Sequence, residues 1–380
     1  MTPDSAPPQS RPRGWGRLVP VVGLLLLSPV CAEYLIGYDA SIGSPLAMLA
    51  GLLVLAPLYG AVAVLIREAT RRTGRGWPTV LLLSTAFGLV QAGLIDQSLF
   101  ALEFDSGDPD WANEQPPTVI PGLEIDARHL LNWVGGHVIW SFAAPIAVVE
   151  TCTPRRADRP WLGPVGLAVM ALLYLGAAAL IASDVYATDR AAAPVELLAT
   201  AAVVLTLVAA AFLIPRPRTT TAPRARAEST ETAQTEAAPA ETAQAGRGKA
   251  PGRAPSPWAF GVAAWLILLA EQSLPTTWTW SAVAADVALL ALLGALVLWG
   301  SRRPGWSRAH TLAVAGGALL VRAGLSFLVE PLGEPDYTLK YVSNTAITLG
   351  VTLLLAWAAH RLPRTTPPPP HAETTARNRV

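Results

Sequence analysis

Long apolar runs alternate along the chain with short polar segments, and these segments are alternately basic and acidic. Each run holds about the 20 residues that a helix needs to cross the hydrocarbon core of a bilayer. The pattern predicts an all-α fold, a polytopic bundle of about ten transmembrane helices. The predicted spans are Leu18–Gly37, Pro45–Ile66, Pro78–Phe100, His129–Glu150, Gly163–Ser183, Ala192–Ile214, Pro257–Leu274, Trp278–Gly300, Ala309–Glu330 and Lys340–Leu362.

The positions of the positive charges support this count. With a cytoplasmic N-terminus, 24 of the 28 Lys and Arg residues fall on the inner side. The exceptions are Arg128, Arg190 and Lys340 on the outer side and Arg322 inside a span. A missed span would exchange the two sides downstream and abolish the asymmetry. We therefore expect both termini in the cytoplasm, and inner Arg residues that act as topology determinants beside anionic lipid.

Composition divides the chain into two membrane halves. Residues 18–215 hold six spans and residues 257–362 hold four. Between them, residues 216–256 are rich in Ala, Thr, Pro, Glu and Arg, with almost no large apolar side chain. Such a segment cannot bury enough surface to offset its ordering entropy, so we predict a disordered cytoplasmic linker. The arm of residues 1–17 and the tail of residues 363–380 are predicted to be disordered as well.

The signatures of cofactor and nucleic-acid binding are missing. Residues 101–128 form an acidic outer loop, either simply solvated or able to attract cations or a basic partner. Its acids lack the regular spacing of an EF-hand, and no Cys or His cluster marks zinc, so we predict no metal site. No phosphate-binding loop or serine-hydrolase elbow occurs, and we predict no cofactor. Nor does any basic patch interleaved with aromatic residues suggest a nucleic-acid partner.

Two short matches predict an internal repeat. Leu89–Leu94 in the third span resembles Leu320–Leu325 in the ninth. A Gly-Trp pair precedes each match at a similar distance. Spans one to four would then correspond to spans seven to ten, as a parallel repeat about an axis normal to the membrane. Some transporters are built in this way.

Two charged residues lie deep inside neighbouring spans. Asp286 in the eighth span and Arg322 in the ninth both lie about 12 Å below the outer boundary, at 1.5 Å per residue. A charge at this depth needs a partner or a wet cavity. We therefore predict an ion pair between Asp286 and Arg322. The pair either fixes the registry of the two helices or binds a substrate or ion.

Further polar residues lie at a similar depth. Gln91, Asn132 and His137 belong to the third and fourth spans, and Glu33 and Glu271 lie nearer the outer surface. Together they predict a polar cavity that opens outward. His137 could serve as a proton relay or ligand group, or it could be a hydrogen-bonded packing residue.

One stretch carries a family resemblance. Ile66-Arg67-Glu68-Ala69, then Gly74 to Pro78 and Phe87 to Val90, resemble a group of uncharacterised bacterial polytopic membrane proteins, in which a Glu pair often stands where this chain has Gln91-Ala92. This resemblance implies a bacterial plasma membrane. There is also a weaker similarity to CAAX-processing intramembrane proteases. The Glu-Glu-x-x-x-Arg and Phe-x-x-x-His motifs of that family are absent, so protease activity is not predicted.

Three functions fit these observations. The first is a secondary permease or small-ligand binding protein that uses the polar cavity, with a small molecule or ion as partner. The second is an intramembrane enzyme acting on a lipid or peptide, with His137 and Glu33 as acid/base groups. The third is a scaffold or accessory subunit with an unidentified protein partner. The first is favoured, because buried charge at matched depth suits a binding cavity.

Overall fold

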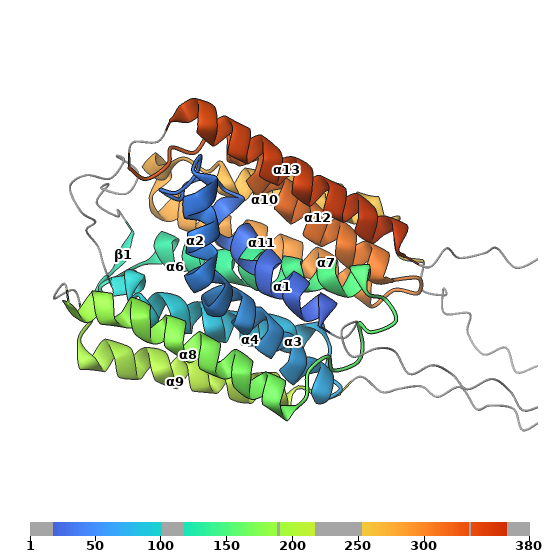
Figure 1. Ribbon diagram of the computed structural model, residues 1–380, viewed down its shortest axis with the longest axis horizontal. Helices are drawn as coiled ribbons and strands as arrows, with labels where there is room; N and C mark the ends of the chain where they lie inside the picture. Colours follow the sequence, from blue (N-terminus) through green and yellow to red (C-terminus); the bar gives the residue numbers. More distant parts are fainter. Residues whose placement is uncertain (1–17, 101–117, 188–190, 217–252, 334–335, 363–380) are drawn as a thin grey trace, which may run out of the picture.

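The computed structural model describes residues 18–100, 118–187, 191–216, 253–333 and 336–362, which form an all-α bundle (Figure 1). The predicted disordered segments and most of the acidic loop lie outside these ranges. The elements are α1 (Val19–Pro29), η2 (Val30–Tyr34), α2 (Pro45–Leu55), η3 (Ala56–Gly60), α3 (Ala61–Arg72), α4 (Trp77–Val90), η4 (Gln91–Ile95), η5 (Ser98–Phe100), β1 (Val119–Ile120), β2 (Ile125–Asp126), α6 (Ala127–Gly136), η6 (His137–Ala143), α7 (Ala144–Cys152), α8 (Pro164–Ala187), α9 (Pro194–Leu213), α10 (Pro257–Gln272), η7 (Thr276–Trp278), α11 (Trp280–Ser301), α12 (Arg308–Leu325) and α13 (Tyr337–His360).

All ten predicted spans are helical, which confirms the all-α fold of about ten helices. Seven of these helices are long and apolar enough to cross a membrane. The other three are α1 with its continuation η2, α10, and α12. α10 has 16 residues, or about 24 Å of helix, against a hydrocarbon core of about 30 Å.

The connections between helices lie at two ends of the bundle. We call the end with the segments around Arg75 and Arg308 the basic end, and the end with the segments around Tyr38 and Asp126 the acidic end. At the basic end, Arg75 donates hydrogen bonds to the carbonyls of Phe212 and Ile214, and Arg308 pairs with Asp158. At the acidic end, the Leu332 amide donates to the Tyr38 carbonyl, and the Ala192 amide donates to the Gln97 side chain at 2.6 Å. The sequence predicts that the basic end faces the cytoplasm.

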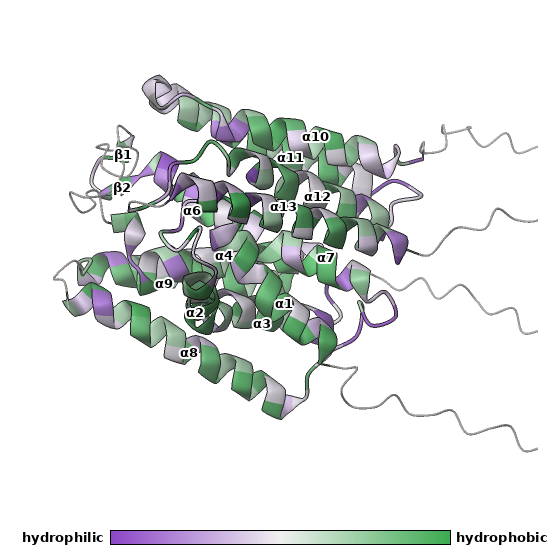
Figure 2. Cartoon of the chain, turned by 45° about the horizontal axis from the view of Figure 1, so that its top comes forward, coloured by the Kyte–Doolittle hydropathy of each residue, from purple (hydrophilic) through white to green (hydrophobic). Residues whose placement is uncertain are grey.

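Helices at the centre of the bundle are buried, and those at its edge are not. Every residue of α7 is buried, from Ala144 to Cys152. α8, α9, α11 and α13 instead expose Leu and Val side chains such as Leu172, Leu205 and Leu353. Figure 2 shows mostly hydrophobic residues along the helices and hydrophilic ones in the loops at both ends. Exposed apolar helix faces of this kind are in contact with lipid.

Four spans contain a π-helical segment: η2, η3, η4 and η6. Prolines explain three of them, because proline lacks an N–H and displaces the carbonyl four residues earlier. Pro29 precedes η2, Pro57 lies within η3, and Pro145 follows η6. The carbonyl that Pro145 frees belongs to Ser141, and it accepts a hydrogen bond of 2.5 Å from the Ser28 hydroxyl.

Glycines allow two pairs of helices to approach closely. A Cβ on Gly60 would lie 2.1 Å from the carbonyl oxygen of Leu25 in α1, and one on Gly317 would lie 2.4 Å from that of Gly261 in α10. Either substitution would force the backbones apart. Small residues commonly play this part between membrane helices.

The predicted internal repeat gains no support from the packing. In the second set of four spans, the first and third helices, α10 and α12, pack most extensively on each other. In the first set, α1 packs mainly on the second and fourth spans, through η3 and α7. All four π-helical segments of the described residues lie in spans one to four. The repeat therefore stays a prediction.

Candidate functional site

A polar cavity of about 940 Å³ lies toward the acidic end of the bundle. Helical residues of five spans (η2, η3, α6 with η6, α10 and α12), the hairpin of β1 and β2, and the connecting segments at this end line it. Its polar and charged lining residues are Glu33, Tyr38, Tyr59, Asp96, Ser98, Thr118, Asp126, Arg128, His129, Asn132, His137, Ser141, Gln272, Thr279, Arg322 and Glu330.

The π-helical segments carry several of these side chains. Glu33 belongs to η2, Tyr59 to η3, and His137 and Ser141 to η6. A π turn inserts a residue and so redirects the side chains that follow it. For this reason such segments are frequent at functional sites. Here they bring polar groups of three spans to one cavity.

Arg322 reaches the cavity from α12. Its guanidinium carbon lies 4.0 Å from the centroid of the Trp140 ring, and one of its terminal nitrogens lies against Gly136. The Nε atom is buried and has no hydrogen-bond partner. Glu271 and Glu33 are near enough to act on Arg322 by charge. Among the described residues, however, no carboxylate lies within ion-pair distance of it.

His137 also has an unused polar atom. Its Nδ1 lies 2.6 Å from the Trp133 carbonyl oxygen, so Nδ1 carries the proton and donates it. In the neutral imidazole Nε2 is then a lone-pair acceptor, and this atom is buried without a partner. The ring packs against Tyr59, at 5.6 Å between centroids. Arg322 and His137, which both line the cavity, therefore each carry one buried polar atom without a hydrogen-bond partner, a donor on Arg322 and an acceptor on His137.

The carboxylates around the cavity are held by protein donors. The Tyr38 hydroxyl donates to Glu33. Burial, reinforced by the negative charge of Glu33, raises the pKa of Tyr38 well above its usual value, so this hydroxyl stays protonated. Asp126 accepts from the Thr118 hydroxyl at 2.6 Å and from the His129 amide at 2.8 Å.

The structure gives Asp286 a different partner from the predicted one. Its carboxylate lies 3.9 Å from Nε of Arg128, a residue of α6, and Arg322 lies on Trp140 instead. Arg128 also donates to the Leu274 carbonyl at 2.6 Å. The predicted pair of Asp286 and Arg322 is therefore not the pair that the structure contains. Equal depth does not ensure that two side chains point toward each other.

The other predicted residues divide into two groups. Glu33, Asn132 and His137 line the cavity together with Arg322. Gln91 and Glu271 are buried close behind it. Gln91 donates to Asp96 at 3.2 Å, and Glu271 accepts from Gln272 at 2.8 Å.

Two tyrosines of the cavity were not predicted from the sequence. Tyr38 lies just beyond the first helix and Tyr59 in the middle of the second span. Tyr38 donates a hydrogen bond to Glu33, and the Tyr59 ring packs against that of His137. Tyr59 follows Pro57 by two residues, and a proline inside a predicted span is the signal that could have indicated an irregular, functional turn.

The basic end contains a charge network that the sequence did not predict. Arg67 is fully buried in α3 and donates to Glu68 at 2.8 Å and to Glu150 of α7 at 3.1 Å. Its guanidinium carbon lies 3.6 Å from the centroid of the Trp161 ring. Arg71 donates to both oxygens of Glu150, at 2.7 and 2.6 Å. We call Arg67, Glu68, Arg71 and Glu150 the charge network.

Every member of the charge network has partners. Arg67 also donates to the Ala157 carbonyl at 2.6 Å, and Glu68 accepts from the Trp161 amide at 2.7 Å. No buried side-chain atom of the four lacks a hydrogen bond. The sequence interpretation had made Arg67 and Arg71 topology determinants beside lipid. The structure corrects their placement beside lipid: the Arg67 side chain is fully buried, that of Arg71 is 10% exposed, and both join the second span to the fourth through Glu150.

The lining of the cavity suits a polar molecule. Within the described ranges, no group of three or more His, Cys, Asp or Glu residues could hold a metal ion. An anion could bind Arg322, and a hydrogen-bond donor could bind Nε2 of His137.

Comparison with known proteins gives a single finding. Residues 22–359 match the model of a family described as an uncharacterized membrane protein family. No curated protein matches, and no solved structure matches. The similarity to CAAX-processing proteases therefore receives no support.

Proposed function

Since this chain belongs to an uncharacterized family of membrane proteins, its function must be argued from its own site. We propose that it binds a small anionic ligand in the polar cavity, as the binding step of a secondary permease. The observation that carries this proposal is Arg322. Its guanidinium lines the cavity with a buried, unpaired Nε and with no carboxylate in ion-pair contact within the described part of the chain.

A buried cation without a partner is costly. Inside a membrane a charged side chain costs at least about 2.5–3.5 kcal/mol, and structures normally offset this with a paired charge or a wet cavity. The carboxylates that line the cavity include Glu33 and Asp126, which already accept bonds from protein donors. A ligand with a carboxylate or phosphate group would supply the counter-charge and the hydrogen-bond acceptor that Arg322 lacks.

His137 narrows the class of ligand. Its free Nε2 accepts a hydrogen bond, so a ligand with a hydroxyl or ammonium group beside its anionic group would satisfy both unpaired atoms. The cavity volume of about 940 Å³ lies within the range of about 300–1,000 Å³ typical of small-molecule sites. Hydroxy acids, amino acids and small phosphorylated compounds fit this description.

The position of the cavity near one end of the bundle favours a permease over a simple channel. The cavity lies toward the acidic end, and the charge network joins the second and fourth spans at the basic end. A site open to one side and closed to the other is what alternating access requires of one of its states.

The first experiment measures binding. The purified full-length protein would be heated in detergent with lactate, alanine, inorganic phosphate or glucose, and its Tm recorded. We expect at least one ligand with an anionic group to raise the Tm of the wild type, because a ligand at 100 times its Kd stabilises the native state by about 2.7 kcal/mol. Arg322→Met should lose this rise while remaining folded.

Arg303→Met is the matched control. Arg303 also stacks on a tryptophan, with its guanidinium carbon 4.2 Å from the Trp299 centroid, but it lies outside the cavity. It should keep the full ligand-induced rise in Tm. If no anionic probe raises the Tm of the wild type, or if Arg322→Met responds as the wild type does, the binding proposal is wrong and a scaffold is favoured.

The second experiment measures transport. The stabilising ligand, radiolabelled, would be offered to proteoliposomes that contain wild type or Arg322→Met. The proposal expects uptake with the wild type only. Binding without any uptake or counterflow would disprove the permease and leave a ligand receptor.

An intramembrane enzyme is the second candidate, and one observation favours it. The free Nε2 of His137 could remove a proton, and Glu33 acts on this imidazole by charge. This alternative expects a chemically changed product from a lipid or peptide incubated with the wild type, and none with His137→Gln.

A further inference from the structure

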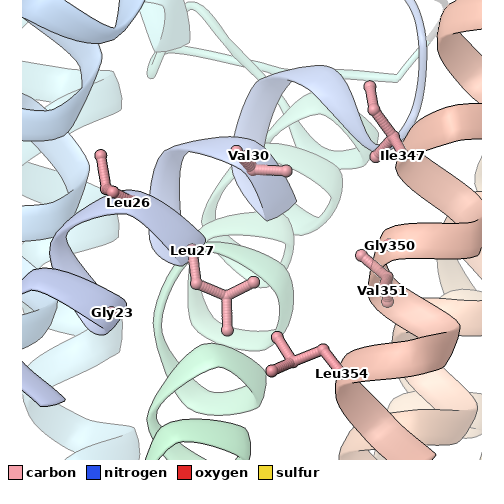
Figure 3. Close-up of a pocket in the computed structure, with 8 residues that line it drawn as sticks. All are labelled: Gly23, Leu26, Leu27, Val30, Ile347, Gly350, Val351 and Leu354. Atoms are coloured by element: carbon pink, nitrogen blue, oxygen red, sulfur yellow. The ribbon is translucent and has the colours of Figure 1, made fainter. Parts of the chain in front are cut away.

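A second, wholly apolar groove lies between α1 and α13, away from the polar cavity. Its lining residues are Gly23, Leu26, Leu27, Val30, Ile347, Gly350, Val351 and Leu354, and its volume is about 310 Å³ (Figure 3). Figure 3 shows Leu27 and Leu354 pointing toward each other across the groove. No polar side chain lines it.

Two glycines keep the groove open. A Cβ on Gly350 would meet no atom within 4 Å, and one on Gly23 would meet only Val149, at 4.0 Å. Elsewhere in the bundle, glycines such as Gly60 and Gly317 bring helices into contact. These two instead leave space that no side chain of the described residues fills.

The groove is long enough to hold part of a lipid chain. Along α13 it extends from Ile347 to Leu354, about 10 Å of helix. One leaflet contributes about 15 Å to the hydrocarbon core. The groove runs from the middle of α13 toward the basic end and so fits within the leaflet at that end.

Two residues whose chemistry suits a lipid headgroup, Trp357 and Arg361, lie beyond the end of the groove along α13. Trp357 and Arg361 succeed Leu354 at intervals of three and four residues, so all three share one face of the helix. The Arg361 guanidinium carbon lies 5.3 Å from the Trp357 centroid, and it acts by charge on Cys152 at the end of α7. Tryptophan is enriched at the level of the lipid headgroups, and arginine is enriched in the cytoplasmic segments beside it.

We infer that the groove binds one acyl chain of an anionic phospholipid whose phosphate pairs with Arg361. The apolar lining suits the chain, and the charge of Arg361, about 10 Å beyond Leu354 along the helix, suits the phosphate. This lipid site is separate from the polar cavity and does not depend on the proposed function.

The test counts bound lipid on the full-length protein. The protein would be reconstituted in an equal mixture of phosphatidylglycerol and phosphatidylcholine, extracted mildly, and analysed by native mass spectrometry. The wild type should retain one phospholipid, with phosphatidylglycerol preferred about fivefold, as expected for one arginine near the headgroup.

Two variants test the binding of the acyl chain and of the headgroup separately. Gly350→Phe should fill the groove and lose the retained lipid, and the free space at this position should leave the fold intact. Gly176→Phe is its control, because Gly176 is an exposed glycine of α8 with equally free space. It should keep the lipid. Arg361→Gln should keep a bound phospholipid but lose the preference for phosphatidylglycerol, whereas Arg302→Gln at the end of α11 should keep that preference.

Three results would overturn the inference. The first is equal lipid retention by Gly350→Phe and the wild type. The second is a wild type without preference for phosphatidylglycerol. The third is a dimer that Gly350→Phe alone dissociates, because a second copy would then occupy the groove.

Discussion

The charge network and the polar cavity lie at opposite ends of one bundle, and their charged groups differ in how completely they are hydrogen-bonded. In the charge network, Glu150 accepts three hydrogen bonds from Arg67 and Arg71, and no buried side-chain atom is left unpaired. At the cavity, Arg322 and His137 each keep a buried atom without a partner. We interpret the charges that are fully hydrogen-bonded within the protein as structural. We propose that the groups at the cavity with an atom lacking a partner are kept for a ligand.

The largest effect expected from this comparison is at Glu150. Glu150→Gln removes the shared counter-charge of two arginines that are almost inaccessible to solvent. Because breaking a buried pair leaves an uncompensated charge, we expect a loss of about 3–5 kcal/mol in the free energy of unfolding. Unfolding in mixed dodecyl maltoside and sodium dodecyl sulfate micelles would measure it.

Asp158→Asn is the control for Glu150→Gln. Asp158 also pairs with an arginine at the basic end, but its side chain is 75% exposed. Exposed pairs contribute at most about 1 kcal/mol. A similar cost for both substitutions would mean that the charge network is not the structural element we describe.

The two regions also differ in what the sequence could predict. Counting 1.5 Å per residue placed His137 and Arg322 at a similar depth, with Asn132 on the same helix as His137 and Glu33 nearer the outer surface, and all four line the cavity. Depth alone did not give the direction of a side chain around its helix. Asp286 therefore meets Arg128 of α6, and Arg322 meets Trp140.

The charge network escaped prediction for a different reason. The predicted second span ended at Ile66, because Arg67, Glu68 and Arg71 follow it. The helix continues to Arg72, since Glu150 of α7 neutralises the arginines inside the protein. This contact joins residues more than 75 positions apart. A contact between residues so far apart cannot be predicted from the local pattern of hydrophobic and polar residues.

Lys340 tests whether a charged group is structural because it is hydrogen-bonded or because of the end of the bundle at which it lies. It lies at the acidic end, yet it is 1% exposed and donates to the carbonyls of Ser326 and Val329, at 3.1 and 2.6 Å. Lys340→Met would leave the Val329 carbonyl unpaired, while the Ser326 carbonyl keeps its bond from the Asn344 amide, and it should cost about 1–3 kcal/mol. Lys340→Arg, which keeps donors at this position, should cost less in the same unfolding assay. Equal costs would mean that the two hydrogen bonds contribute nothing.

The smallest effect on stability is expected at Arg322. Arg322→Met loses the contact with Trp140, a cation–π interaction of about 1 kcal/mol or somewhat more, but it also removes a buried cation that lacks a counter-charge within 4 Å among the described residues. These changes oppose each other, so the free energy of unfolding without ligand should stay within about 1 kcal/mol of the wild type. Arg303→Met loses a similar stacking contact with Trp299 without that relief, and it should be the less stable of the two variants. A loss at Arg322 as large as that at Glu150 would show that the cavity arginine supports the fold. Near-neutral stability combined with lost ligand response would show that its charge is kept for binding.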